Sequence, residues 1–509
     1  MNRTQSSLRN IKYAVIGQAT GVMVSFIARY VFINTLGSVY LGISGLFTNI
    51  LSILSLAELG VGAAIVYSLY KPLAEEDHLK VKALMNLYKK AYITIGIIIA
   101  VGGIIITPFL QFFVKDFHDI SNLKFIFLLF VTNASISYFF AYKRSLIIAD
   151  QKRYIATLYR YSFFVGLNIV QIVILLSWKN YILFLILQII FTFMENLAVS
   201  KKADNIYPYI KTDSKVALDI NTKREISKNV KAMVGHKVGG VIVNGTDNIL
   251  IAKIFGVILV GVYSNYLLIL NSINIIVSML FQAVLSSIGN LAVSESKGKT
   301  REIFYSINLI GFWIYGLISI CLSFLLIPFL NLWIGLEYTF SLGITIILII
   351  NFYINGMRKS VLTFRDAMGL FWYDRHKPYF EIILNLILSI VFAQRFGLVG
   401  VFLGTTLSTM IVCFWVEPYI LFKYGFKSEV RPYFINYIKF FLILSGTYIS
   451  IWYVSSLIGL NITTWFQLIA FTVFLLIFVN IVFLLLFRRT KEFKYLYSVF
   501  KPRLNFLRK

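Results

Sequence analysis

Long apolar stretches of similar length follow one another along almost the whole chain. Each is close to the ~20 residues that an α-helix needs to cross the hydrocarbon core of a bilayer. The pattern therefore predicts an all-α polytopic membrane protein with about fourteen transmembrane helices. The predicted spans are 11–36, 41–70, 84–112, 123–149, 154–177, 181–200, 231–254, 258–292, 302–331, 339–366, 379–395, 398–422, 434–458 and 464–487.

Positive charge is concentrated in every second connection between these stretches. Of the 48 Lys and Arg residues, all but six lie in or beside the connections on one side, which is also the side of the N-terminus. Because Lys and Arg favour the cytoplasmic side, we expect a bacterial plasma (inner) membrane protein with both termini in the cytoplasm. The first apolar stretch is long enough to span, so we expect a retained anchor and not a cleaved signal. The six exceptions are Arg29, Lys115, Lys124, Lys179, Lys253 and Arg395.

Composition agrees with a membrane protein and argues against other classes. Hydrophobic residues make up 59% of the chain and charged residues 14%, against about 25% charged residues in soluble domains. The net charge of +26 is explained by loop cations that set topology and contact membrane lipids, and not by nucleic acid as a partner. Both cysteines lie inside predicted spans and the four histidines lack the spacing of metal ligands. We therefore expect no metal site. We also expect no resident cofactor and no enzymatic activity.

The first six spans and the next six repeat one another at an offset of 219 residues. The matching polar and glycine positions are Asn10 with Asn229, Gly21 with Gly240, Gly37 with Gly256, and Gly42 with Gly261. An even number of spans in each half gives a parallel repeat, with a pseudo-two-fold axis along the membrane normal; such transporters bind their cargo between the halves. We therefore expect two pseudo-symmetric six-helix lobes at 1–215 and 216–424, followed by two added helices and a cytoplasmic tail at 425–509.

A polar stripe runs along the first helix of each half. Ser25 and Arg29 each fall within about 20° of Gln18 around a helix. The offset of 219 places Lys237, Asn244 and Asn248 at the equivalent positions of the seventh span. Charges inside a membrane are costly unless they face a cavity or a partner, so the stripes predict a central, cationic cavity that binds substrate. Two alternatives stay open: Lys237 extends to the inner surface, and Arg29 pairs with an acid.

Other polar residues lie near the inner ends of their spans. Arg144 lies in the fourth span, and Asn355, Arg358 and Arg365 lie in the tenth. They predict an inner-side entry for the substrate, and a role in topology alone is an equal alternative.

Acidic residues are rare within the spans. Glu58, Glu195 and Asp247 lie well inside, and we expect them to pair with cations or to take up H⁺ or Na⁺ during a transport cycle. Glu381 and Glu417 lie near predicted inner ends and fit ordinary interfacial groups.

Short motifs recur in a characteristic order. The first set is Leu54–Tyr70 with Glu58, Gly60 and Gly62, followed by Lys71–Leu73 and Tyr88–Lys90. The second set is Asp247–Ile251, then Gly256, Gly261, Tyr263, Ser264 and Asn265, then Ser287–Asn290. The third set is Phe364–Phe371, Asn385–Leu388 and Gly397–Gly404.

In order and spacing these motifs resemble Wzx-type flippases, the polysaccharide-transporter branch of the MOP superfamily, and among them Gram-positive capsule or exopolysaccharide members. The superfamily also holds MATE exporters and lipid II flippases. The resemblance covers most of residues 8–425, and it implies two six-helix lobes, two added helices and a cationic cavity. It also implies a cargo: an oligosaccharide repeat unit on undecaprenyl diphosphate, moved from the inner to the outer leaflet by alternating access. Other polysaccharide assembly proteins would be partners.

Two other functions stay open. A MATE-like ion-coupled multidrug exporter shares the fold but moves cations, and the cationic stripes argue against it. A membrane polysaccharide polymerase would be expected to carry a large outer loop with catalytic Arg or His, whereas the predicted outer loops are short.

The charge asymmetry predicts a topology that reporter fusions can test. A phosphatase reporter fused after Val114 should be active, because this position lies in a predicted outer loop. Fusions at Lys211 and after Arg489 should be inactive, because these positions lie in predicted cytoplasmic segments. An active fusion at Lys211 would overturn the orientation.

Overall fold

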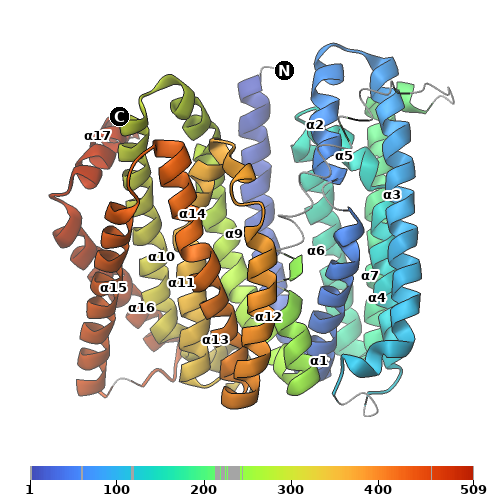
Figure 1. The fold of residues 1–509 in the computed structure, drawn as a ribbon. Coiled ribbons are helices and arrows are strands. Elements are labelled where there is room, and N and C mark those ends of the chain that lie inside the picture. The colour runs from blue at the N-terminus through green and yellow to red at the C-terminus, as the bar shows by residue number, and fades with distance from the viewer. Residues whose placement is uncertain are drawn as a thin grey trace. The chain divides into compact units, whose positions relative to one another are not determined.

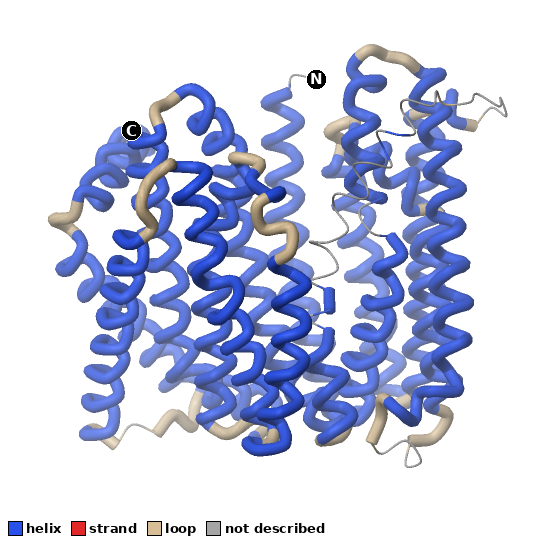
Figure 2. Tube along the Cα trace, viewed as in Figure 1, coloured by secondary structure: helices blue, strands red, loops and turns tan. Residues whose placement is uncertain are grey.

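The computed structural model describes residues 3–58, 61–115, 120–211, 245–459 and 461–507, together with single positions at 218, 224, 226, 241 and 242. Within these residues every regular element is a helix and none is a strand (Figure 2). The chain divides into two compact units, Met1–Ser264 and Asn265–Lys509. The lobe boundary predicted at residue 215 stays a prediction.

The first unit is built from long helices that pack side by side (Figure 1). Its helices are α1 (Arg3–Leu54), α2 (Val61–Ala74), α3 (His78–Ile106), α4 (Leu123–Phe139), α5 (Ala141–Ala149), α6 (Arg153–Trp178) and α7 (Tyr181–Ile206). Short 3₁₀ turns at Ser55–Glu58, Thr107–Phe112 and Pro208–Ile210 extend α1, α3 and α7. α1 packs against α6, and α4 packs against both α3 and α7.

The second unit contains most of α9 and the remaining helices. These are α9 (Val257–Ser294), α10 (Lys297–Ile334), α11 (Leu342–Ala367), α12 (Lys377–Phe396), α13 (Leu398–Ser408), α14 (Phe414–Ile420), α15 (Arg431–Leu457), α16 (Trp465–Phe487) and α17 (Lys491–Leu507). Wider π-type turns at Thr409–Cys413 and Leu421–Phe426 flank α14, and 3₁₀ turns lie at Leu336–Tyr338 and Leu370–Trp372. α12 packs against α13, and α10 packs against α11 and α16.

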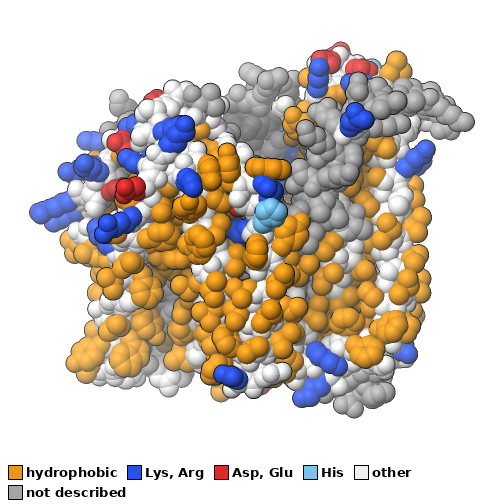
Figure 3. Space-filling model, viewed as in Figure 1, with side chains coloured by type: hydrophobic (Ala, Val, Ile, Leu, Met, Phe, Trp, Pro, Cys, Tyr) orange, Lys and Arg blue, Asp and Glu red, His pale blue; other side chains and the backbone are white. Residues whose placement is uncertain are grey.

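Ten helical segments are long and apolar enough to cross a membrane in the described part of the chain, or eleven if the bent pair α4 and α5 counts as one span. Three of the fourteen predicted spans are therefore not among these eleven, and each absence has a simple explanation. α1 joins the first span to the start of the second, the seventh span lies mostly outside the described residues, and α11 carries polar residues that lower its hydropathy. Hydrophobic side chains cover most of the face in Figure 3, and Lys and Arg gather toward its upper and lower margins. The prediction of an all-helical membrane protein is confirmed.

The repeat is visible in the backbone of two matched glycines. Gly37 breaks α1 with a φ of 78°, and Gly256 precedes α9 with a φ of 98°. Both values lie in the left-handed region that glycine adopts readily. The break predicted between the first two spans therefore lies at Gly37, and its partner at the offset of 219 has the same kind of backbone.

A second matched pair brings two backbones into direct contact within the first unit. A Cβ added to Gly42 would lie 1.8 Å from the carbonyl oxygen of Val257, and a Cβ added to Gly261 would lie 2.3 Å from that of Ser38. Val257 is the residue that the offset of 219 matches to Ser38, so the two contacts are reciprocal. Reciprocal contacts are the mark of a two-fold axis, and they support the predicted pseudo-symmetry.

Aromatic side chains fix the last helices to α10. Phe312 stacks on Phe440 of α15 with ring centroids 4.3 Å apart, and Trp313 donates a hydrogen bond to Asn480 of α16 at 2.8 Å. Trp313 also stacks on Phe493 of α17 at 6.0 Å. The two C-terminal spans and α17 are thus packed parts of the second unit.

Replacing Gly261 with alanine should lower stability, because the new Cβ would overlap a backbone oxygen that cannot move independently. Overpacking of this kind costs about 1–3 kcal/mol. Thermal unfolding of the purified protein in mild detergent measures the effect. Gly446→Ala is the matched control, because nothing lies within 4 Å of a Cβ at this helical position. An unchanged melting temperature for Gly261→Ala would contradict the close backbone contact.

Candidate functional site

The polar stripe on α1 is present, but its members face different neighbours within the first unit. Arg29 donates a hydrogen bond from Nη1 to the Ser264 hydroxyl of α9 at 2.7 Å. Gln18 accepts a hydrogen bond from the Tyr161 hydroxyl of α6 at 2.7 Å. Ser25 bonds back to the Gly21 carbonyl of its own helix. The arginine of the stripe is therefore directed toward the helix that follows the predicted seventh span.

The matching stripe is only partly described. Lys237 and Asn244 lie outside the described residues. Asn248 and Asp247 lie on the helical stretch before α9 and are 4% and 5% exposed. The shared cationic cavity stays a prediction.

The charges predicted near the inner end of the first unit form pairs. Arg144 of α5 donates to Glu195 of α7 at 2.5 Å and to the Asn196 side chain at 3.2 Å. The neighbouring Lys143 binds Asp204 at 2.8 Å. Two helices far apart in sequence are therefore joined by two ion pairs.

Glu58 has a different neighbour. It lies in the turn that ends α1, and the Tyr138 hydroxyl of α4 donates to its Oε2 at 3.3 Å. A tyrosine hydroxyl satisfies a carboxylate without neutralising it.

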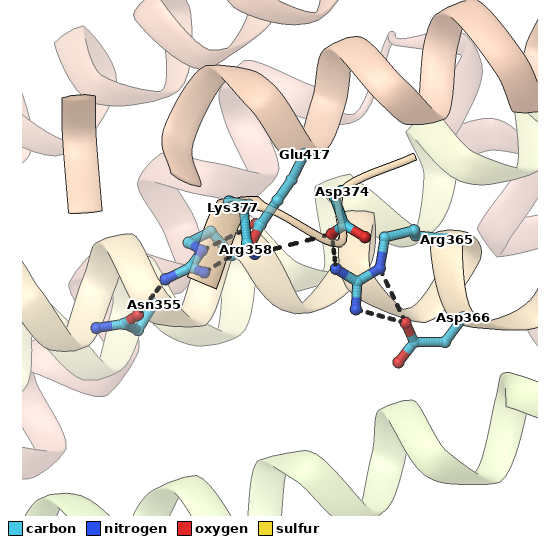
Figure 4. A network of polar contacts seen from close by, with 7 residues as sticks. All are labelled: Asn355, Arg358, Arg365, Asp366, Asp374, Lys377 and Glu417. Carbon is cyan, nitrogen blue, oxygen red and sulfur yellow. Dashed lines mark hydrogen bonds and ion pairs between the residues drawn. The ribbon is translucent and has the colours of Figure 1, made fainter. Parts of the chain in front are cut away.

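In the second unit, α11, α12 and α14 meet around a fully buried carboxylate (Figure 4). Arg358 of α11 binds Glu417 of α14 with two hydrogen bonds, from Nε at 2.9 Å and from Nη2 at 2.7 Å. Lys377 at the start of α12 donates to the same carboxylate. Arg358 also donates to the Asn355 side chain at 2.8 Å. The Glu417 side chain has 0% exposure, so its charge is met by the two cations instead of by water.

A second carboxylate extends this cluster along α11. Arg365 donates to Asp374 and, at 2.8 Å, to Asp366. Asp374 is 2% exposed and lies 3.9 Å from Lys377. The cluster thus alternates three cations with three acids (Figure 4), an arrangement that offsets the large desolvation penalty of buried charges.

The structure brings together Asn355, Arg358 and Arg365, which the stripe on the tenth span had singled out. Sequence reasoning missed their partners Asp366, Asp374 and Lys377, and it treated Glu417 as interfacial, which is wrong because this side chain is completely buried. The sequence did contain a signal for this pairing, because Glu417 is an isolated acid in an apolar stretch. An acid so placed needs a cation from another span.

The two Arg–Glu pairs occupy similar places in the predicted repeat. In each half, an arginine at the inner end of the fourth span binds a glutamate of the sixth: Arg144 with Glu195, and Arg358 with Glu417. An asparagine accepts a further hydrogen bond from each arginine. No group of three His, Cys, Asp or Glu residues in the described chain is placed to hold a metal ion.

No protein-family model matches the chain, and no curated protein sequence matches it. Solved structures do match. A lipid II flippase, MurJ, in an inward closed conformation aligns with a TM-score of 0.63 and 14% identity, over 97% of this chain and 99% of that one. An inward-facing multidrug resistance MATE family transporter of the MOP superfamily aligns with a TM-score of 0.54 and 14% identity, over 79% and 94%.

A Vibrio cholerae MATE transporter also aligns with a TM-score of 0.54, at 13% identity, over 84% of this chain and 99% of that one. At such low identities these matches show the fold. The chain is a multi-pass membrane protein with the helical fold that MurJ and the MATE transporters share.

The buried pair of Arg358 and Glu417 should couple strongly in stability. Glu417→Leu should lower the free energy of unfolding by about 3–5 kcal/mol, because it leaves the buried Arg358 and Lys377 without the carboxylate they share. Arg358→Met should lower it less, because Lys377 still pairs with Glu417. The double variant should lose less than the sum of the two. Unfolding of the purified protein in mild detergent measures all three variants.

The exposed pair of Lys299 and Glu302, 3.5 Å apart, is the matched control. Its coupling should not exceed about 1 kcal/mol. Equal coupling for the two pairs would show that burial contributes nothing to the strength of the cluster.

Proposed function

We propose that the chain is a Wzx-type flippase. It would move oligosaccharide units linked to undecaprenyl diphosphate from the inner to the outer leaflet of the plasma membrane, for capsule, exopolysaccharide or other cell-surface polysaccharides. The observation that carries the proposal is the extent of the structural likeness. It reaches 97% of the chain for a lipid II flippase but 79% and 84% for the two MATE transporters.

A cationic cavity would lower the energetic cost of moving the proposed cargo across the membrane. Its diphosphate and sugars would lose their hydration in the hydrocarbon core, at a cost of several kcal/mol for each unpaired polar group. A guanidinium offers charge-assisted hydrogen bonds that match phosphate oxygens. Arg29 carries such a group within a span, and its Nη1 donates a hydrogen bond to the Ser264 hydroxyl at 2.7 Å. We propose that it contacts the diphosphate.

The remaining site residues have supporting roles in this proposal. Gln18, Ser25, Asn244 and Asn248 would bind sugar hydroxyls, and Lys237 would add a second cation from the other lobe. Arg144, Asn355, Arg358 and Arg365 would lie on the entry route at the inner side. The pairing of Arg144 with Glu195 favours ion pairing over H⁺ or Na⁺ coupling for this acid, and Glu58 and Asp247 stay candidates for coupling.

The rival with the same fold is a MATE-like exporter of cationic drugs. Its cavity should be neutral or acidic, because a cation in the binding site would repel the cargo. The partly buried Arg29 therefore favours an anionic cargo.

Charge at position 29 should decide export. Arg29→Ala should reduce polysaccharide export by about tenfold or more, since a hydrogen bond to a charged group contributes about 1.5–3 kcal/mol. Arg29→Lys should keep part of the activity, and Arg29→Glu should be the most defective, because it repels the diphosphate. The assay is complementation of a flippase-null strain, with membrane abundance measured in parallel.

Lys253→Glu is the control, because Lys253 is an exposed cation at the predicted outer end of a span. It should export normally. In defective variants, lipid-linked repeat units should accumulate on the cytoplasmic side. Normal export by Arg29→Glu at normal membrane abundance would show that Arg29 does not bind the diphosphate. It would favour the alternative function, a MATE-like exporter.

A further inference from the structure

A basic concavity lies where the π-type turn after α14 leads into α15. It has a volume of about 680 Å³, and three cations line it: Lys423, Lys427 and Arg431. Glu429 is the acid in its lining. All of these residues belong to the second unit. We call this concavity, defined by Lys423, Lys427, Ser428 and Arg431, the basic pocket.

A fourth cation, outside the lining of the pocket, lies near Lys427. Lys297, the first residue of α10, lies close enough to Lys427 for the two ammonium groups to interact. Within the described residues neither Lys427 nor Arg431 forms an ion pair. Like charges held together repel one another, and an anion placed between them turns the repulsion into attraction.

The backbone at Lys427 and the side chain of Ser428 also indicate a ligand site. Lys427 has a φ of 52°, in the left-handed region where glycine is usual at the end of a helix. The Ser428 N–H closes this turn on the Phe422 carbonyl at 3.0 Å. The Ser428 hydroxyl is buried and has no hydrogen-bond partner within the described residues. Strain and an unsatisfied donor together indicate a position shaped for a ligand.

Aromatic side chains of the kind that gathers near lipid headgroups surround the pocket. Lys423 donates to the Tyr419 hydroxyl at 2.7 Å, and Tyr424 stacks on Tyr373 with ring centroids 3.9 Å apart. Tyrosine and tryptophan gather at the membrane–water interface. Tyr419, Trp415 and Ile411 follow one another at intervals of four residues and are 39%, 51% and 53% exposed. They form an apolar stripe that leads away from the pocket along α14 and into the π-type turn Thr409–Cys413 before it.

We propose that the basic pocket binds the phosphate headgroup of an anionic glycerophospholipid, whose acyl chains lie along the stripe of Tyr419, Trp415 and Ile411. Lys427 and Arg431 contact the phosphate, and the Ser428 hydroxyl donates to one of its oxygens. Charge complementarity selects an anionic over a zwitterionic lipid, because the pocket carries a net positive charge. The proposal concerns a resident lipid and does not depend on the cargo of the transporter.

Lipid binding can be measured on the purified full chain, by native mass spectrometry or by thermal shift, with phosphatidylglycerol and phosphatidylcholine as probes. The wild type should bind phosphatidylglycerol preferentially. The double variant Lys427→Gln, Arg431→Gln should bind it about tenfold more weakly. Lys89→Gln, Lys90→Gln is the matched control, because it removes two exposed cations from the first unit, and it should change binding less than twofold.

A second variant separates binding from folding. Lys427→Gly removes the charge but suits the left-handed backbone, so it should raise the melting temperature without added lipid. Phosphatidylglycerol should raise the melting temperature of the same variant by less than it raises that of the wild type.

Three results would overturn the proposal. Equal losses in the pocket and control variants would mean that general charge attraction accounts for binding. Equal binding of the two lipids would remove the headgroup from recognition. Inorganic phosphate that stabilises the wild type as well as phosphatidylglycerol does would identify a free anion as the ligand.

Discussion

A charge within an apolar helix must find its partner inside the protein, and this requirement determines how the helices of each unit pack. Glu417 has no exposure, so α14 is held where Arg358 and Lys377 both reach its carboxylate. The same requirement joins α5 to α7 through Arg144 and Glu195. Breaking one partner of such a pair costs far more than the pair contributes relative to an apolar core. The pairs therefore specify which helices meet.

Close backbone contact is the other constraint, and here the repeat is most visible. Gly42 and Gly261 make reciprocal contacts with Val257 and Ser38, and no side chain fits between them. The matched Gly37 and Gly256 turn the chain just before these contacts, each with a positive φ. The glycine turn and the close backbone contact that follows it therefore belong to one sequence segment, which occurs twice in the chain. The repeat is thus preserved where backbone geometry demands glycine, while the apolar surfaces around it have diverged.

The sequence was sufficient to predict features within a single helix, such as its length and its polar face. It was insufficient to predict which helices contact one another. Apolar length predicted the spans, and the break at Gly37 followed from its place between two of them. Helical spacing placed Asn355, Arg358 and Arg365 on one face. It could not show that Glu417, about sixty residues later, would meet that face, because a one-dimensional pattern does not state which helices become neighbours. The α1 stripe illustrates the same limit: Gln18 faces α6 and Arg29 faces α9.

Alternating access requires that each half of a transporter hold together while the halves exchange their contacts. The Arg–Glu pairs meet the first part of this requirement, because each joins the fourth and sixth spans of one predicted half. Paired cations are also poor ligands for a passing anion, which would have to displace a carboxylate already at hydrogen-bond distance. Arg29 donates to the Ser264 hydroxyl, and a hydrogen bond from the same guanidinium to a charged phosphate oxygen would be the stronger of the two. Under the proposed function, the inner-end arginines therefore mainly stabilise each half, and Arg29 recognises the cargo.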